Sequence, residues 1–115
     1  MRRTIVALVA FALAVVIAGC TGSSANLDAS PVETGAITMK DTAYQPAHIQ
    51  VPARTTVTWT NGDQIPHDVS FDGGPQSEVL SFGGTFQRVF DTPGVFDYEC
   101  TIHPGMVGRV TVVPR

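Results

Sequence analysis

The sequence has little cysteine, little positive charge and no long apolar segment, and each shortage argues against a class of protein. Seven Lys and Arg residues stand against ten Asp and Glu residues, which gives a net charge of −3. A nucleic-acid-binding surface is therefore not expected. The apolar run at positions 5–17 is shorter than the roughly 20 residues that a membrane-spanning helix needs. Two cysteines are too few for a disulfide-stabilised scaffold.

The first 19 residues have the pattern of an export signal. Arg2 and Arg3 precede the apolar run, which ends in the small-residue sequence IAGC at 17–20. This pattern predicts a signal peptide at 1–19, and IAGC resembles the bacterial lipobox, in which the cysteine is lipidated. We expect a lipoprotein held through Cys20 at the extracytoplasmic face of the cell membrane, either periplasmic or on the cell surface. An ordinary signal peptide with a chance cysteine, or an uncleaved anchor, is the alternative.

Processing at this site would change the rest of the chain. Removal of residues 1–19 takes away two basic residues and no acidic one, so the mature chain has a net charge of −5. Lipidation of Cys20 would leave Cys100 as the sole thiol, which is either buried and inert or bound to a metal. The small, polar stretch at 20–35 is typical of a flexible tether. The remaining residues, 36–115, are expected to form one small domain.

Short strand-like segments recur through this domain. Seven segments rich in β-branched or aromatic residues are expected to be strands: 36–39, 48–51, 55–60, 67–71, 85–90, 95–100 and 108–113. Clusters of Gly, Pro, Asn and Asp separate them, and no segment has a helical period over three turns. The pattern predicts an all-β antiparallel sandwich or barrel. Alternation within 95–100 directs Phe96, Tyr98 and Cys100 to one apolar face.

The sequence CTIHPGM contains three different metal-binding side chains. Cys100, His103 and Met106 follow one another at steps of three residues, and the Pro-Gly pair can fold the segment back on itself. His67, at the start of another expected strand, supplies a second imidazole. One thiolate, two imidazoles and one thioether suit copper that cycles between two oxidation states. Zinc competes, but its usual ligands seldom include a thioether.

The segments VTWTNGDQIPHDV and FDTPGVFDYECTIHPGMVGRVTV resemble the cupredoxins, the type 1 blue-copper proteins, in their plastocyanin- and amicyanin-like subgroup. The resemblance covers nearly all of 36–113 and implies a Greek-key β-sandwich of about seven to eight strands. It also implies that His67, Cys100 and His103 are equatorial ligands of one mononuclear copper and that Met106 is the axial ligand. The short spacing before the methionine is most like amicyanin. One departure is Asp68, which stands where the family commonly has Asn.

The ligand set and the resemblance together imply a one-electron carrier. We expect a monomer whose redox donor and acceptor dock transiently on an apolar surface around His103. Enzymatic activity is not expected, because a single site uses every histidine except His48. Storage, sensing or delivery of copper without electron relay is the main alternative, and a metal-free interaction domain is another. The scattered acids, Asp63 among them, are interpreted as mostly solvated.

Overall fold

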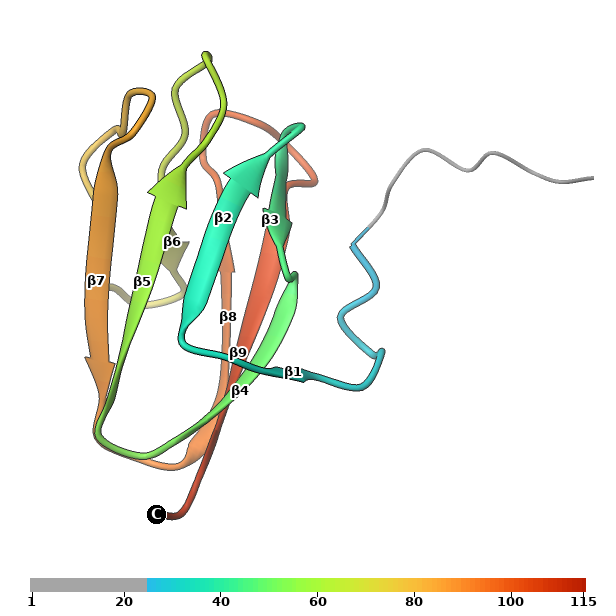
Figure 1. The fold of residues 1–115 in the computed structure, drawn as a ribbon, viewed down its shortest axis with the longest axis vertical. Helices are drawn as coiled ribbons and strands as arrows, with labels where there is room; N and C mark the ends of the chain where they lie inside the picture. The colour runs from blue at the N-terminus through green and yellow to red at the C-terminus, as the bar shows by residue number, and fades with distance from the viewer. Residues whose placement is uncertain (1–24) are drawn as a thin grey trace, which may run out of the picture.

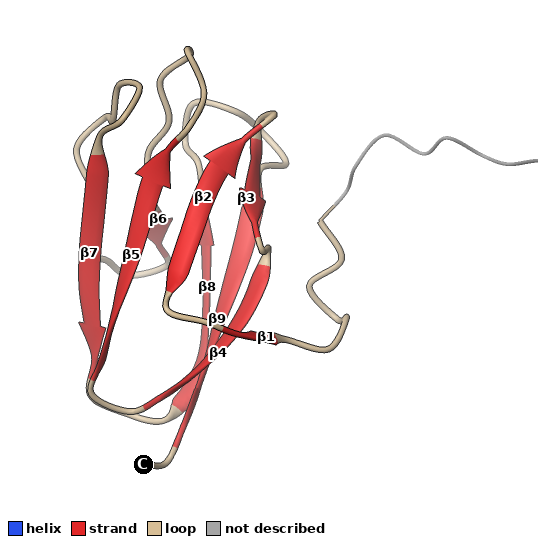
Figure 2. Cartoon of the chain, in the orientation of Figure 1, coloured by secondary structure: helices blue, strands red, loops and turns tan. Residues whose placement is uncertain are grey.

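The computed structural model describes residues 25–115, so the expected signal peptide at 1–19 and Cys20 lie outside the described residues. The described chain forms two β-sheets packed face to face (Figures 1 and 2). Its strands are β1 (Val32–Glu33), β2 (Ala36–Lys40), β3 (Ala43–Gln45), β4 (His48–Pro52), β5 (Thr55–Asn61), β6 (Ser70–Phe71), β7 (Thr85–Phe90), β8 (Gly94–Glu99) and β9 (Val107–Val113). None of residues 25–115 belongs to a helix with the length and hydrophobicity required to cross a membrane.

The all-β sandwich is confirmed, with two differences in detail. Residues 25–115 contain nine strands rather than seven or eight, in the orders β1-β4-β9-β8-β6 and β3-β2-β5-β7. The pairing is mixed rather than wholly antiparallel, because β4 pairs in parallel with both β1 and β9, and β2 with β5. Parallel neighbours need a crossover connection. The chain provides one when it leaves β2, passes through β4 in the other sheet and returns as β5.

Residues before the expected domain boundary at 36 are also part of the folded domain. Strand β1 lies within the stretch 20–35 that was expected to be a tether, and Val32 pairs with Ile49 on β4. Before β1, the Arg109 guanidinium donates a hydrogen bond to the Leu27 carbonyl at 3.3 Å. Residues 27–33 therefore contact β4 and β9, and we call them the N-terminal strap.

The core lies between the two sheets and is centred on Trp59. Alternation along β5 buries Val57 and Trp59 completely. The Trp59 ring meets Phe71 and Tyr98 edge to face, with centroids 5.8 and 5.4 Å apart. Phe96 is half-buried on β8, whereas Tyr98 is buried. These contacts hold the end of β8 in place, and Cys100 is the residue that follows this strand.

Several connections lie together at one end of the sandwich, the upper end in Figure 1. They are the turn between β2 and β3, the loop between β5 and β6, the loop between β8 and β9, and the last part of the loop between β6 and β7. The expected strand at 67–71 is reduced to β6, which has two residues. The residues before β6 instead form an isolated bridge between His67 and Leu80. The upper end therefore holds irregular segments on a rigid sheet framework, where binding sites commonly lie.

Candidate metal centre

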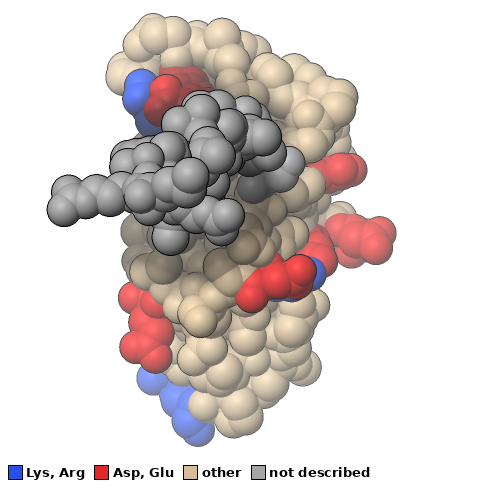
Figure 3. Space-filling model, turned by 90° about the vertical axis from the view of Figure 1, so that its right-hand side faces the viewer, with Lys and Arg blue, Asp and Glu red and all other residues tan. Residues whose placement is uncertain are grey.

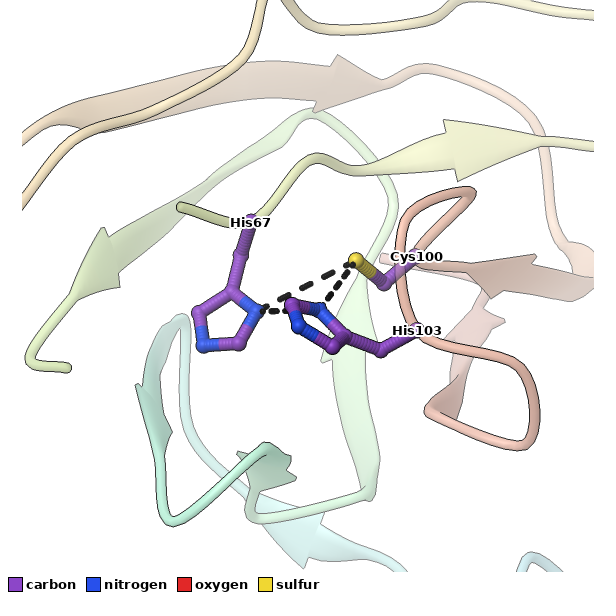
Figure 4. Close-up of side chains that lie close together, drawn as sticks. All are labelled: His67, Cys100 and His103. Atoms are coloured by element: carbon purple, nitrogen blue, oxygen red, sulfur yellow. Dashed lines mark hydrogen bonds between the residues drawn. The ribbon is translucent and has the colours of Figure 1, made fainter. Parts of the chain in front are cut away.

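Three of the predicted ligand side chains converge at this end. Donor atoms of His67, Cys100 and His103 lie within 4.8 Å of one another (Figure 4). The two Nδ1 atoms are 3.1 Å apart, and the Cys100 sulfur lies 4.0 Å from the Nδ1 of His67 and 3.6 Å from that of His103. His67 and Cys100 are buried, and His103 is half-buried. Two side chains from one loop and one from another thus face a common point.

The loop between β8 and β9 is closed by its own backbone. The Cys100 N–H donates to the Met106 carbonyl at 2.9 Å, and the Met106 N–H donates to the His103 carbonyl at 3.1 Å. Pro104 and Gly105 occupy the centre of this four-residue turn, and Gly105 has a φ of 85°. Proline followed by a residue of positive φ defines a type II turn. The turn brings the buried Met106 back beside Cys100, as the sequence predicts.

His67 is held at both its backbone and its ring. Its N–H and carbonyl exchange hydrogen bonds with Leu80 at 3.2 and 2.7 Å. Its Nε2 lies 2.8 Å from a carboxylate oxygen of Asp63, so the ring donates a proton there and turns Nδ1 toward Cys100. A histidine whose outer nitrogen is hydrogen-bonded has its tautomer and orientation fixed for metal binding.

Asp63 is a buried part of the site, although the sequence indicates only a solvated acid. Its two carboxylate oxygens accept hydrogen bonds from the backbone N–H groups of Asp41 and Thr42, both at 2.9 Å. Burial alone would raise its pKa, but the hydrogen bonds from Thr42, His67 and Asp41 outweigh this effect and lower the pKa to about 2. The only sequence signal is its position four residues before His67.

Asp68 connects the two loops that carry the ligands. One carboxylate oxygen accepts the Thr101 N–H at 2.7 Å, and the other accepts the Thr101 hydroxyl. The Asp68 carbonyl accepts the Tyr44 hydroxyl at 2.6 Å. Burial alone would raise the Asp68 pKa, but the hydrogen bonds from the Thr101 hydroxyl and N–H lower it. The carboxylate therefore joins the loops, with Thr101 supplying both protons.

The donor set fits copper. Cys100 is the free cysteine of residues 25–115, and it faces two imidazole nitrogens at the end of a rigid sandwich. A thiolate with two imidazoles, completed by a weaker thioether, is the ligand set of type 1 copper. His48 lies elsewhere, on the outer face of β4. Its ring nitrogens lie 3.0 Å from the Ala29 carbonyl and 2.7 Å from the Thr111 hydroxyl.

The fold and this centre define a small copper protein of the cupredoxin class, and the chain belongs to the cupredoxin family. Residues 8–112 match the family model described as Cupredoxin-like domain. Over 113 residues, the chain is 36% identical to amicyanin-alpha of Methylorubrum extorquens, and the match covers 92% of each chain. It is also 34% identical over 83 residues to the plastocyanin of Scenedesmus fuscus, which covers 60% of this chain and 85% of the plastocyanin.

Solved structures of cupredoxins also resemble this chain. The Cu(I) form of an amicyanin mutant superposes with a TM-score of 0.66 at 29% identity, over 71% of this chain and 86% of amicyanin. A purple cupredoxin from Nitrosopumilus maritimus gives a TM-score of 0.64 at 33% identity, over 68% of this chain and 98% of the other. Together with the convergent donors, this likeness identifies the cofactor as type 1 copper, as in amicyanin.

Proposed function

We propose that the protein carries single electrons between two redox proteins through one copper ion. His67, Cys100 and His103 would hold the ion, and the Met106 thioether would be a weaker fourth ligand. The convergence of the first three donors carries this proposal, because their nearest atoms already lie 3.1 to 4.0 Å apart. Copper bound there would supply a one-electron couple between Cu(I) and Cu(II).

The contribution of the chain is to keep these donors in place in both oxidation states. The Asp63 carboxylate holds the outer edge of the His67 ring. Two backbone hydrogen bonds close the loop that carries Cys100 and Met106, and Asp68 joins this loop to the residues that follow His67. Ligands held by the protein need little rearrangement when the charge at the site changes, which favours rapid electron transfer.

Apolar side chains around His103 support a docking surface for the redox partners. Ile65 and Ile102 are 43% and 40% exposed, and Pro66 and Pro104 are also exposed. Ile65 and Pro66 come from the loop between β5 and β6, and Ile102 and Pro104 come from the loop between β8 and β9. A small apolar surface suits brief encounters, because it buries enough area for recognition without holding the partner for long. We propose that the protein docks there as a monomer.

We further propose that the protein is exported and held at the membrane by a lipid on Cys20. The basic start, the apolar run and the sequence IAGC support this, and they predict a signal peptide at 1–19. The copper domain, expected at 36–115, would carry the N-terminal strap docked on it, and residues 21–26 would link the strap to the lipid. In this arrangement the carrier works at the extracytoplasmic face of the membrane, beside its redox partners.

The visible spectrum of the copper-loaded protein tests the proposed function. Addition of Cu(II) to the purified protein should give an intense charge-transfer band from thiolate to copper. Cys100→Ser should abolish the band, because serine provides no thiolate. His48→Ala removes the histidine outside the centre and should leave the band unchanged. A wild-type protein without the band would refute the copper site.

The electron self-exchange rate separates the carrier from a storage or delivery protein. Line broadening in NMR spectra of mixed Cu(I) and Cu(II) protein measures this rate. A carrier should exchange electrons readily between identical molecules, since its donors are already in position. Very slow exchange together with tight retention of Cu(I) would contradict electron relay and favour storage or delivery.

A further inference from the structure

The Asp63 carboxylate lies where it can act on the centre without touching a metal. Its Oδ2 is 2.8 Å from the Nε2 of His67, and its side chain is 10% exposed. The Lys40 ammonium lies 3.9 Å from Oδ1, and its own side chain is 52% exposed. The backbone N–H of Asp63 donates to the side chain of Asn61 at 2.8 Å, which fixes the start of the loop.

The turn between β2 and β3 is built around this carboxylate. Lys40 pairs with Ala43, so Asp41 and Thr42 form a two-residue hairpin turn. Their φ angles are 53° and 56°, which makes the turn type I′. Thr42 is unfavourable there, because a β-branched residue rarely adopts positive φ. The conformation directs two successive backbone N–H groups at Asp63, which is the geometry of a backbone anion site.

We propose that Asp63 is a positioning residue for the copper centre, an inference that rests on the proposed function. Held as an anion by the turn, it keeps His67 in the tautomer protonated at Nε2, so that the Nδ1 lone pair faces Cys100 and His103. It also places a fixed negative charge one ring away from the metal. A negative charge there stabilises Cu(II) relative to Cu(I) and so lowers the reduction potential.

The competing explanation is that Asp63 merely ties the hairpin turn to the loop. Both roles predict that Asp63→Ala destabilises the fold, so stability does not separate them. The tautomer of His67 and the ratio of Cu(II) to Cu(I) affinity do separate them. A purely structural acid would change neither of these once the protein is folded.

The first measurement is long-range ¹⁵N NMR of His67 in the metal-free protein. The wild type should show the Nε2–H tautomer, and Asp63→Ala should populate both tautomers. A wild-type His67 protonated at Nδ1, or an unchanged tautomer in Asp63→Ala, would overturn the positioning role. This test needs no copper, so its failure is distinguishable from loss of the charge-transfer band, which would refute the copper site.

The second measurement is the ratio of Cu(II) to Cu(I) affinity in two matched variants. Asp63→Asn keeps the shape of the side chain but removes its charge, and should lower the ratio about tenfold, which corresponds to about 59 mV in potential. Asp41→Asn removes the same charge from an exposed side chain in the same turn, leaves its backbone donor intact, and should change the ratio less than twofold. Equal effects in the two variants would overturn the electrostatic role.

Discussion

Gly108 on β9 makes room for a side chain of β8, the strand that ends just before Cys100. A Cβ atom at this position of β9 would lie 2.2 Å from the Cζ atom of Tyr98, far inside van der Waals contact. Tyr98 is two residues before Cys100 on β8, and its ring packs against Tyr44 with centroids 4.6 Å apart. The missing side chain of Gly108 therefore makes room for the ring that anchors the end of β8.

Gly108→Ala should lower the free energy of unfolding by at least about 1–3 kcal/mol, the usual cost of overfilling a packed core. Urea unfolding of the metal-free protein measures it. The same substitution in a Tyr98→Leu background should cost less, because the smaller side chain leaves room for the new methyl group. Equal costs in the two backgrounds would show that the contact between Gly108 and Tyr98 is not responsible.

Single residues differ in how much the sequence reveals about them. Cys100, His103 and Met106 could be predicted as a group, because a thiol, an imidazole and a thioether seldom occur within seven residues by chance. Asp63 could not, because carboxylates are common and mostly solvated. Its burial depends on the turn at Asp41, 22 positions earlier, and no local pattern at Asp63 reports that contact.

The two ligand-bearing loops behave as one unit because Asp68 bridges them. Its carboxylate accepts both the backbone N–H and the hydroxyl of Thr101, across 33 positions of sequence. Asparagine, common at this position in the family, has a single side-chain oxygen, whereas a carboxylate offers one oxygen to each proton. The substitution of Asp for Asn thus suits the donors present on Thr101.

Asp68→Ala should lower the free energy of unfolding by about 1–3 kcal/mol, because the Thr101 N–H would lose its partner. It should also speed the release of copper to a chelator, since the loops would be free to separate. Thr101→Val removes only the hydroxyl donor and should have a smaller effect on both. Stopped-flow chelation and urea unfolding provide the two measurements. Identical release rates in wild type and Asp68→Ala would contradict the bridge.

At the level of elements, the long alternating segments were predictable and the short ones were not. The segment 85–90 coincides with β7, and 95–100 differs from β8 by one residue at each end. Strands β1 and β3 have two and three residues, too few to establish an alternating pattern. The parallel pairs were missed as well, because strand order depends on crossovers between sheets rather than on any one segment.

At the scale of the whole molecule, the acidic side chains visible on one face do not gather into one patch. On the face seen in Figure 3 they lie in separate groups, with a few basic residues among them. Asp97 is paired with Arg109 through hydrogen bonds of 2.7 and 3.0 Å. Hydrogen bonding to Arg109 lowers the pKa of Asp97. The same guanidinium holds the N-terminal strap, so this ion pair aligns the chain entering the domain.

Arg109→Gln should release the strap while leaving the sandwich folded. Glutamine cannot reach both Asp97 and the Leu27 carbonyl, so amide hydrogen exchange in residues 27–33 should become faster. Arg115→Gln removes an equal charge at the far end of β9, where Arg115 donates to the Ala53 carbonyl, and should leave the strap unchanged. Unchanged exchange in Arg109→Gln would show that the pairing of β1 with β4 holds the strap alone.

The docked strap also limits how far the copper domain could travel. With a lipid on Cys20, as we propose, only residues 21–26 separate the membrane anchor from the first docked residue, Leu27. Six residues reach at most about 22 Å when fully extended. The carrier would then search a thin layer at the membrane surface, where short linkage raises the effective concentration of membrane-bound partners. Release of the strap would lengthen the linker between the lipid and the domain, and so lower the effective concentration of membrane-bound partners. The copper centre itself would not change.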